Sequence, residues 1–333
     1  MLKFGATILP DPPCTRFVEL VQLAEECGFD AAWTYDSHIL WQDGSVFIPT
    51  ALAATDRIQL GFCVTNPGTR EPTTSASYHA TLNSMYPGRI VNAIGRGDSA
   101  RRTIGYDPVT VGEFRRSVVL IRELMNGRPG TLNDKEIVLE WASGLPEIPI
   151  YVAGYGPKVL AIAGSEANGV IIQLADLDII DWIMDQARTA AAEAGRDPAA
   201  LEPIVCAPVV LDDDRAAARE LVRWFPAMVS NHVVDLLKRY DQSQLPPTLT
   251  DYLQRREFYD YSEHSRIGAA HGSFVDDETC DRFCILGSVD DHIAKLQAMA
   301  DRGVRQFNIY LMTGSQEDTL RAYGEQIIPQ FQA

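Results

Sequence analysis

Short runs rich in hydrophobic residues alternate along the chain with longer amphipathic stretches. This alternation is typical of βα units that build a parallel sheet. Eight runs are predicted strands: residues 3–9, 31–35, 59–63, 90–94, 149–153, 169–173, 203–210 and 306–311. Helices are predicted at residues 14–27, 48–54, 73–85, 111–126, 157–163, 177–194, 215–224 and 289–302, with a closing helix at 316–330. Eight strands with intervening helices favour an α/β fold of the (β/α)8 TIM barrel type over a doubly wound sheet.

Two stretches do not fit this repeat, and we interpret both as insertions into one domain that spans residues 1–333. The first lies near residues 129–145 and contains TLNDKEIVLEW, which predicts a hairpin. The second, residues 226–284, is a polar, helix-prone excursion before the last strand. Insertions of this kind often lie over the C-terminal face of a barrel and help to close its active site. An oligomer contact or a solvent-exposed helical excursion is the alternative.

The charge balance limits the classes of partner. The net charge is −16, which argues against nucleic acid or an anionic membrane surface as a ligand. No apolar run reaches the roughly 18 residues of a membrane span, and the first residues lack the pattern of a secretion signal. We therefore expect a cytoplasmic protein.

Cysteine and histidine spacing does not predict a metal site. The six cysteines form no paired CxxC motif, so reduced thiols are expected. Cys280 and Cys284 lack a second ligand pair nearby, while His264 and His271 lie seven residues apart. The sequence motifs of the commonest hydrolases and phosphate-transfer enzymes are also missing.

In a barrel, chemistry is expected where strands end and βα loops begin. The second predicted strand is followed by Asp36, Ser37, His38 and Trp41. Histidine is the natural acid or base near neutral pH, and an aspartate can orient it or bind a ligand hydroxyl. The alternative is that His38 is a hydrogen-bonded loop residue and Trp41 a packing residue.

Three later loops carry glycine, proline and cations. Residues 61–72, GFCVTNPGTREP, form a stiff loop that could be a simple turn or could press backbone against a planar ring. The fourth strand runs into Arg96 between two glycines, where backbone N–H groups can approach a ligand. The fifth strand ends in Gly154-Tyr155-Gly156-Pro157-Lys158, which predicts a helix N-terminus beside a lysine and thus an anion site.

In order and spacing, these four loops resemble the luciferase-like superfamily of flavin and deazaflavin oxidoreductases. The resemblance covers residues 3 to about 331. It is strongest to the branch that uses coenzyme F420, which includes methylenetetrahydromethanopterin reductase and F420-dependent glucose-6-phosphate dehydrogenase. The stretches 65–72 and 88–98 carry it most clearly. It implies a barrel with an excursion between its seventh and eighth strands, in agreement with residues 226–284.

The resemblance implies roles for individual residues. Asp36 and Asn66 are expected to contact the coenzyme, and Cys63–Val64 is expected to be a non-prolyl cis peptide that forms a bulge behind the deazaflavin ring. The phosphate-bearing tail of F420 is expected to lie against Arg96, Gly97, Tyr155, Gly156 and Lys158. Hydride transfer between the deazaflavin and a small organic substrate is the implied reaction.

The catalytic residues depart from the family pattern. The glucose-6-phosphate dehydrogenases have His directly after the Asp, whereas here Ser37 intervenes and His38 is displaced by one position. We expect His38 as proton donor or acceptor, Trp41 as a wall or charge-stabilising face of the site, and Asp98 as a second acid or base. The alternatives are an FMN-dependent monooxygenase on the same fold and a non-catalytic ligand-binding barrel. By analogy with the family, we expect a homodimer.

Overall fold

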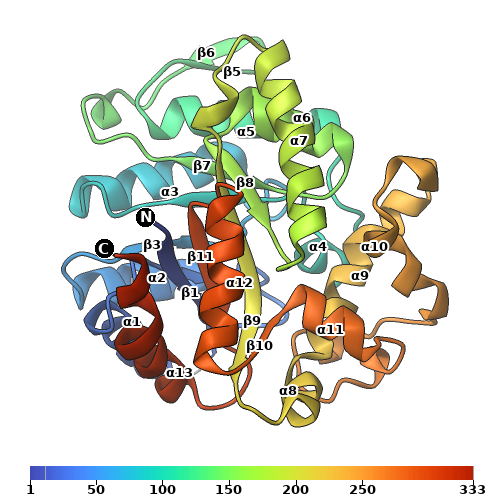
Figure 1. The fold of residues 1–333 in the computed structure, drawn as a ribbon. Coiled ribbons are helices and arrows are strands. Elements are labelled where there is room, and N and C mark those ends of the chain that lie inside the picture. The colour runs from blue at the N-terminus through green and yellow to red at the C-terminus, as the bar shows by residue number, and fades with distance from the viewer. Residues whose placement is uncertain (12, 333) are drawn as a thin grey trace.

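The computed structural model describes residues 1–11 and 13–332, and its centre is a ring of eight parallel strands (Figure 1). Seven of the eight neighbouring pairs of strands in the ring form parallel ladders, including the pair of the last strand with the first. The strands are β1 (Lys3–Thr7), β2 (Ala31–Thr34), β3 (Gln59–Phe62), β4 (Asn92–Ile94), β7 (Ile150–Ala153), β8 (Gly169–Ile172), β9 (Glu202–Leu211) and β11 (Gln306–Tyr310). Between β3 and β4, two single bridges, Leu60–Ile90 and Thr65–Ile94, close the ring. The predicted (β/α)8 barrel is confirmed.

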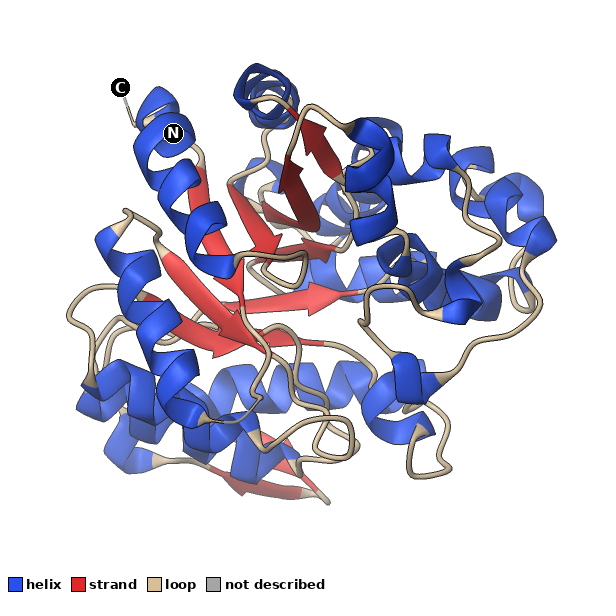
Figure 2. Cartoon of the chain, turned by 90° about the horizontal axis from the view of Figure 1, so that it is seen from below, coloured by secondary structure: helices blue, strands red, loops and turns tan. Residues whose placement is uncertain are grey.

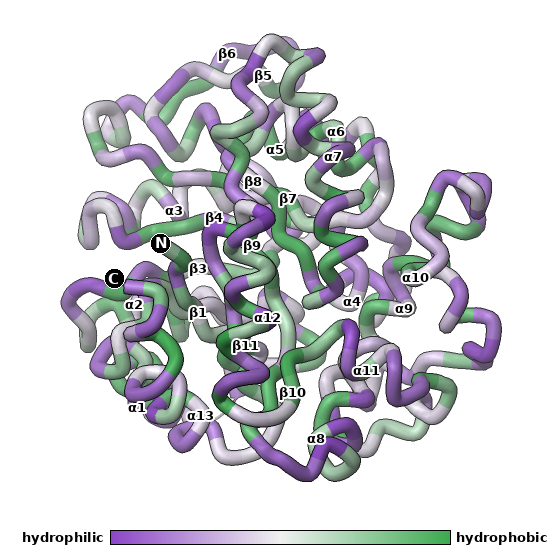
Figure 3. Tube along the Cα trace, in the orientation of Figure 1, coloured by the Kyte–Doolittle hydropathy of each residue, from purple (hydrophilic) through white to green (hydrophobic). Residues whose placement is uncertain are grey.

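Helices surround the strands (Figure 2). Outside the segment between α8 and β10 they are α1 (Cys14–Glu26), α2 (Gly44–Ala53), α3 (Pro72–Met85), α4 (Ser99–Arg102), α5 (Val111–Met125), α6 (Pro157–Glu166), α7 (Leu177–Glu193), α8 (Arg215–Val222), α12 (Val289–Asp301) and α13 (Gln316–Ala322). Hydrophobic positions gather on the central strands and hydrophilic ones on the outer helices (Figure 3). Because a strand inside a barrel is covered on both faces, its sequence is a nearly continuous hydrophobic run, which is why the pattern predicts the strands so readily.

Two local features differ from the sequence-based prediction. Helix α2 begins four residues before the predicted start, because the Asp43 carboxylate accepts a hydrogen bond from the N–H of Ser45 and caps the helix. A short additional strand, β10 (Ile285–Gly287), pairs with the distal end of β9. The predicted hairpin near residue 131 is present as β5 (Gly130–Leu132) and β6 (Lys135–Ile137).

The excursion lies to one side of the barrel, beside α4 (Figure 1). It contains α9 (Trp224–Leu237), α10 (Pro247–Thr250), α11 (Asp277–Phe283) and several 3-10 turns between them. Helix α9 is mostly buried. An ion pair between Arg102 of α4 and Asp235 of α9 ties the excursion to the loop after β4. In the described part of the chain, no helix is both long and apolar enough to cross a membrane.

Candidate active site

A cavity of about 430 Å³ opens at the carboxyl ends of the barrel strands, between the βα loops and the excursion. The loops contribute residues 35–37, 63–66, 95–100, 153–156 and Gln173, and the excursion contributes Met228, His232, Asp235, Leu236, Arg239, Tyr240 and His264. This is the end of a barrel where loops from different strands converge, so chemistry-bearing side chains that are far apart in sequence meet here. The excursion therefore forms one wall of the site.

Asp36 is fixed in the cavity wall by a two-point ion pair. It is 3 % exposed, and its two oxygens accept hydrogen bonds of 2.9 and 3.1 Å from the guanidinium of Arg70. The Thr65 hydroxyl donates a further hydrogen bond of 2.6 Å. Burial alone would lower the pKa of Arg70, but its bonds to Asp36 and Asp43 outweigh burial and raise that pKa. The arrangement holds a carboxylate at a defined position in a largely buried wall.

The peptide bond between Cys63 and Val64 is cis, as the resemblance implies. The segment then crosses to β4, where Thr65 N–H donates to Ala93 and Gly95 N–H donates to Thr65. Val64 lies so close to Gly95 that a Cβ at position 95 would be 3.1 Å from Val64 Cγ2. A glycine after β4 thus gives Val64 room to lie against the cavity.

Asn66 and Gly97 form the adjoining corner. Asn66 is 3 % exposed, and its Oδ1 accepts hydrogen bonds from the N–H groups of Gly68 and Thr69. Its amide nitrogen makes no hydrogen bond with any described residue. Gly97 has a φ of +81°, and a Cβ there would lie 2.9 Å from Asn66 Oδ1. The corner therefore requires glycine for both conformation and space.

One end of the cavity is positively charged. Arg96, Lys158 and Arg239 all line it, and none of them forms an ion pair within residues 1–11 and 13–332. Burial, together with the positive charge of Arg239, lowers the pKa of Arg96. Arg96 Nε donates a 2.7 Å hydrogen bond to the Val109 carbonyl, which fixes the guanidinium. Cations left unpaired in a chain of net charge −16 indicate a site for an anion.

Helix α6 begins at this same end. Gly156 is its N-cap and supplies no side-chain cap, so the positive end of the helix dipole lies beside the cavity. A Cβ at Gly156 would lie 2.8 Å from Leu236 Cδ2, which shows how closely α9 packs against this turn. Tyr155 is nearly buried and donates a 3.0 Å hydrogen bond to the Gln173 carbonyl.

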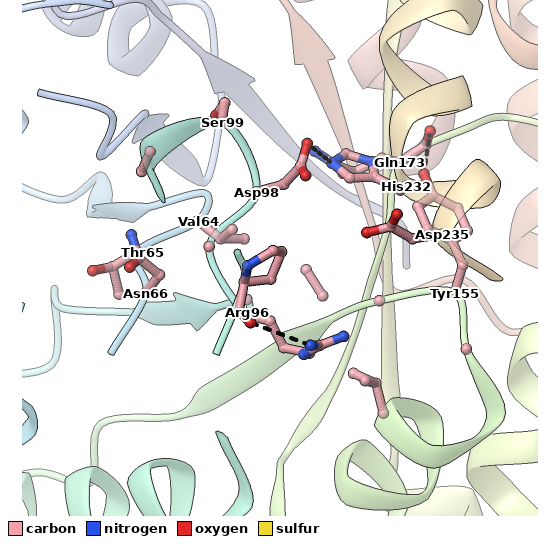
Figure 4. A pocket seen from close by; sticks show the side chains of 18 of the residues that line it. Val64, Thr65, Asn66, Arg96, Asp98, Ser99, Tyr155, Gln173, His232 and Asp235 are labelled. Carbon is pink, nitrogen blue, oxygen red and sulfur yellow. Dashed lines mark hydrogen bonds and ion pairs between the residues drawn. The ribbon is translucent and has the colours of Figure 1, made fainter. Parts of the chain in front are cut away.

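The other end of the cavity holds an acid and an imidazole. Asp98 and His232 turn toward each other, with Arg96 lying apart from them (Figure 4), and their Oδ2 and Nε2 atoms are 3.6 Å apart. Arg102 donates a 2.7 Å hydrogen bond to Asp98 Oδ1, and Tyr261 donates one of 3.2 Å to Oδ2. The His232 ring stacks on Tyr155 at 5.8 Å, and its buried Nδ1 has no partner among the described residues. A carboxylate beside an imidazole at a cavity wall is an arrangement suited to moving a proton.

His264 lies at this end as well. It is 8 % exposed, and burial lowers its pKa to about 3, so the ring is neutral. Its Nδ1 is 2.6 Å from the Tyr259 hydroxyl, and its ring is 5.8 Å from that of Trp41. Nearby, the hydroxyls of Ser37 and Ser99 form a 3.0 Å hydrogen bond across the cavity wall.

Comparison with known proteins identifies the family. The model of the luciferase-like monooxygenase family matches residues 2–306. The chain belongs to this family. It is 28% identical to 5,10-methylenetetrahydromethanopterin reductase of Methanolobus tindarius, over 98% of this chain and 100% of the relative. It is also 28% identical to F420-dependent glucose-6-phosphate dehydrogenase of Nakamurella multipartita, over 96% and 93% of the two chains.

Solved structures agree with the luciferase-like fold. The coenzyme F420-dependent tetrahydromethanopterin reductase of Methanopyrus kandleri superposes with a TM-score of 0.77 at 22% identity, over 99% of both chains. An F420-dependent secondary alcohol dehydrogenase, in complex with an F420-acetone adduct, also gives a TM-score of 0.77, at 20% identity and 98% coverage of both chains. These likenesses establish the shared barrel.

Within this luciferase-like barrel, the expectation for His38 needs correction. His38 is exposed and does not line the cavity. The reason is local: the N–H groups of Leu40 and Trp41 both donate to the Ser37 carbonyl, so the chain turns directly after Ser37 and carries His38 outward. Trp41 does not line the cavity either; it packs behind the wall, 5.0 Å from the ring of Tyr35.

The other predicted site residues all line the cavity: Asp36, Cys63, Val64, Asn66, Arg96, Gly97, Asp98, Tyr155, Gly156 and Lys158. The excursion's contribution, above all His232, Arg239 and His264, is not predicted from the sequence. The one feature of the sequence that could have indicated these residues is the concentration of aromatic and histidine residues in 226–284. No motif in that segment predicts that they lie beside the barrel loops. Among the described residues, no group of three metal-binding side chains comes together.

Proposed function

We propose that this protein is a coenzyme F420-dependent oxidoreductase that transfers a hydride to or from a small organic substrate. The observation that carries the proposal is that one cavity is lined both by three cations without an ion pair in the described chain and by the Asp98–His232 pair. The F420-dependent dehydrogenase of Nakamurella multipartita supports it through a likeness that runs over nearly the whole chain. When bound, the deazaflavin supplies or accepts the hydride.

The residues at the cationic end fit the coenzyme's tail. Arg96, Lys158 and Arg239 are unpaired within the described chain, and the N-terminus of α6 adds the partial charge of its N–H groups. Gly97 and Gly156 line the cavity at this point and add backbone rather than side chains to its wall. We propose that these groups hold the phosphate-bearing tail.

The planar part of the coenzyme fits beside Val64 and Asn66. Val64 gives an apolar wall, and the amide nitrogen of Asn66, which has no partner among the described residues, is a hydrogen-bond donor for a ring or side-arm oxygen. Asp36, whose oxygens are engaged by Arg70 and Thr65, orients this wall. A ring backed on one face is open to substrate on the other.

The Asp98–His232 pair is the proposed route for the proton that accompanies the hydride. Asp98 orients the imidazole from a position that Arg102 and Tyr261 hold, and His232 gives or takes the proton at Nε2. His232 thus takes the role that the sequence predicts for His38. A homodimer and a cytoplasmic location are also part of the proposal; size-exclusion chromatography with light scattering tests the dimer.

Titration of the purified protein with F420 and, separately, with FMN tests the proposed function by fluorescence. F420 is expected to bind with a lower Kd than FMN, and Arg96→Met is expected to raise the Kd for F420 about tenfold, because one charge-assisted hydrogen bond contributes at least about 1.5 kcal/mol. Tight FMN binding without F420 binding would favour the monooxygenase alternative. Failure to bind either coenzyme would favour a non-catalytic ligand-binding barrel.

A further inference from the structure

The acid–base end of the cavity differs from the cationic end in its charge. The cation nearest to it, Arg102, is fully engaged, since it binds Asp98, Asp107 and Asp235. A phosphate or carboxylate placed here would meet the Asp98 carboxylate without an unpaired cation among the described residues to balance it. The hydroxyls of Ser37 and Ser99 also lie at this end and carry no charge. This end is therefore built for an uncharged, oxygen-bearing molecule.

His264 is the buried donor at this end. Its only hydrogen bond within the described chain joins Nδ1 to the Tyr259 hydroxyl, and that hydroxyl has no other partner there. Burial raises the pKa of the Tyr259 phenol, and burial lowers the pKa of His264 to about 3, so the phenol is protonated and the imidazole is neutral. Because the phenol O–H has no other acceptor within the described chain, it is satisfied only when it donates to Nδ1, and the single imidazole hydrogen is then on Nε2.

The Nε2–H group is available to a ligand. The ring lines the cavity, and Nε2 makes no hydrogen bond with any described residue. Trp41 packs on the ring at 5.8 Å and Tyr261 stacks on it at 6.0 Å with planes 21° apart, so the imidazole is held in one orientation. A fixed neutral donor of this kind binds an oxygen atom without giving up a proton.

We propose that the Nε2–H of His264 binds the reacting oxygen of a small uncharged alcohol or carbonyl compound, while His232 exchanges the proton with that oxygen. The inference rests on the proposed function. In the direction of reduction, the carbonyl carbon accepts a hydride from the reduced deazaflavin coenzyme and forms a C–H bond. The π electron pair of the C=O bond moves to oxygen, which takes a proton from His232, and the coenzyme is oxidised by two electrons. The oxidation of an alcohol is the reverse.

The hydrogen bond from His264 strengthens as negative charge develops on that oxygen, so it favours the transition state over the bound substrate. His264→Leu is therefore expected to lower kcat for ketone reduction about 100-fold, in the range seen when one such donor is removed. His264→Gln is expected to retain more activity than the Leu variant, because its amide nitrogen places an N–H donor near the position of Nε2. Neither change is expected to alter the Kd for F420, because the cationic end is untouched.

Reduction is measured with reduced F420 and two ketones, butan-2-one and cyclohexanone, and with the anion 2-oxobutanoate. Oxidation of a second anion, glucose 6-phosphate, is measured with oxidised F420. The ketones are expected to be turned over in preference to both anions. His38→Ala, an exposed change outside the cavity, is the matched control and is expected to leave the rates unchanged. Far-ultraviolet circular dichroism and the Kd for F420 show whether each variant is folded.

A second measurement does not depend on the coenzyme. Long-range ¹H–¹⁵N correlation spectra of protein labelled with ¹⁵N-histidine are expected to show His264 as the neutral Nε2–H tautomer from pH 5 to pH 8. Tyr259→Phe is expected to change the Nδ1 shift of that residue.

The two failures are distinguishable. Protein that binds F420 but prefers an anion, reduces neither ketone, or keeps its kcat in the His264→Leu variant overturns the inference and leaves the proposed function standing. An Nδ1–H or protonated His264 overturns it without any assay of activity, even if the Leu variant does not fold. Absence of F420 binding instead overturns the proposed function.

Discussion

Four of the six histidines are buried, and because burial lowers the pKa of each, His271 included, the stability of the protein depends steeply on pH. His79, His264 and His292 are 1%, 8% and 0% exposed, and burial lowers their pKa values to about 4, 3 and 4. Their contacts favour the neutral ring: His292 Nδ1 lies 2.8 Å from the Tyr323 hydroxyl, and the buried Nε2 of His79 has no partner among the described residues. Protonation would add a charge and an N–H group that the surroundings do not satisfy.

The sign and size of the effect follow from proton linkage. In the unfolded chain a histidine has a pKa of about 6.5, so below that pH the unfolded state binds protons that the folded state does not. The contribution to stability is fully present above about pH 6.5 and is lost as the pH falls from there toward the folded pKa values near 4. Each histidine contributes a slope of about 1.4 kcal/mol per pH unit, or about 4 kcal/mol per unit for His79, His264 and His292 together between roughly pH 6 and pH 4.5.

Urea unfolding followed by tryptophan fluorescence, repeated from pH 4.5 to pH 7.5, measures this slope. His292→Gln is expected to reduce it by about 1.4 kcal/mol per pH unit, whatever the loss of stability at pH 7.5. His38→Ala removes an exposed histidine and is expected to leave the slope unchanged. A free energy of unfolding that varies by less than about 1 kcal/mol between pH 6 and pH 5 would refute the reasoning.

Three further changes test the site and its frame. Arg70→Met leaves a buried aspartate unpaired and is expected to lower the free energy of unfolding by about 3 kcal/mol in urea titrations; a change below 1 kcal/mol contradicts this. Arg239→Met is expected to raise the Kd for F420 about tenfold, whereas Lys238→Met, an exposed neighbour, is the control that leaves it unchanged. Gly164→Ala puts a Cβ 2.1 Å from a backbone oxygen of α7 and is expected to lower the free energy of unfolding by about 2 kcal/mol in thermal or urea unfolding. Gly112→Ala is its control in the same assay, because the nearest atom to a Cβ at position 112 is 3.7 Å away.

Much of the fold and most of the loop residues that we propose to bind the coenzyme can be predicted from the sequence. Strands that are buried on both faces give hydrophobic runs that differ plainly from amphipathic helices, so the hydrophobic pattern by itself predicts eight βα units. The loops at Cys63–Asn66 and Gly95–Asp98 follow directly from their strands, and a barrel places all strand ends at one face. Local sequence is sufficient because strand direction alone decides where these residues lie.

The residues that we propose to act on the substrate are brought together only by the tertiary structure. One turn decides whether His38 or Ser37 faces the cavity: the N–H groups of Leu40 and Trp41 both donate to the Ser37 carbonyl. The pattern of hydrophobic positions along the sequence does not predict such a turn. His232 and Asp98 meet across 134 positions of sequence only because the excursion packs on α4. The sequence by itself determined which residues lie at the strand ends. The packing of the excursion decided which imidazoles lie beside them, because contacts between distant segments depend on burial and complementarity over a whole interface rather than on a local pattern.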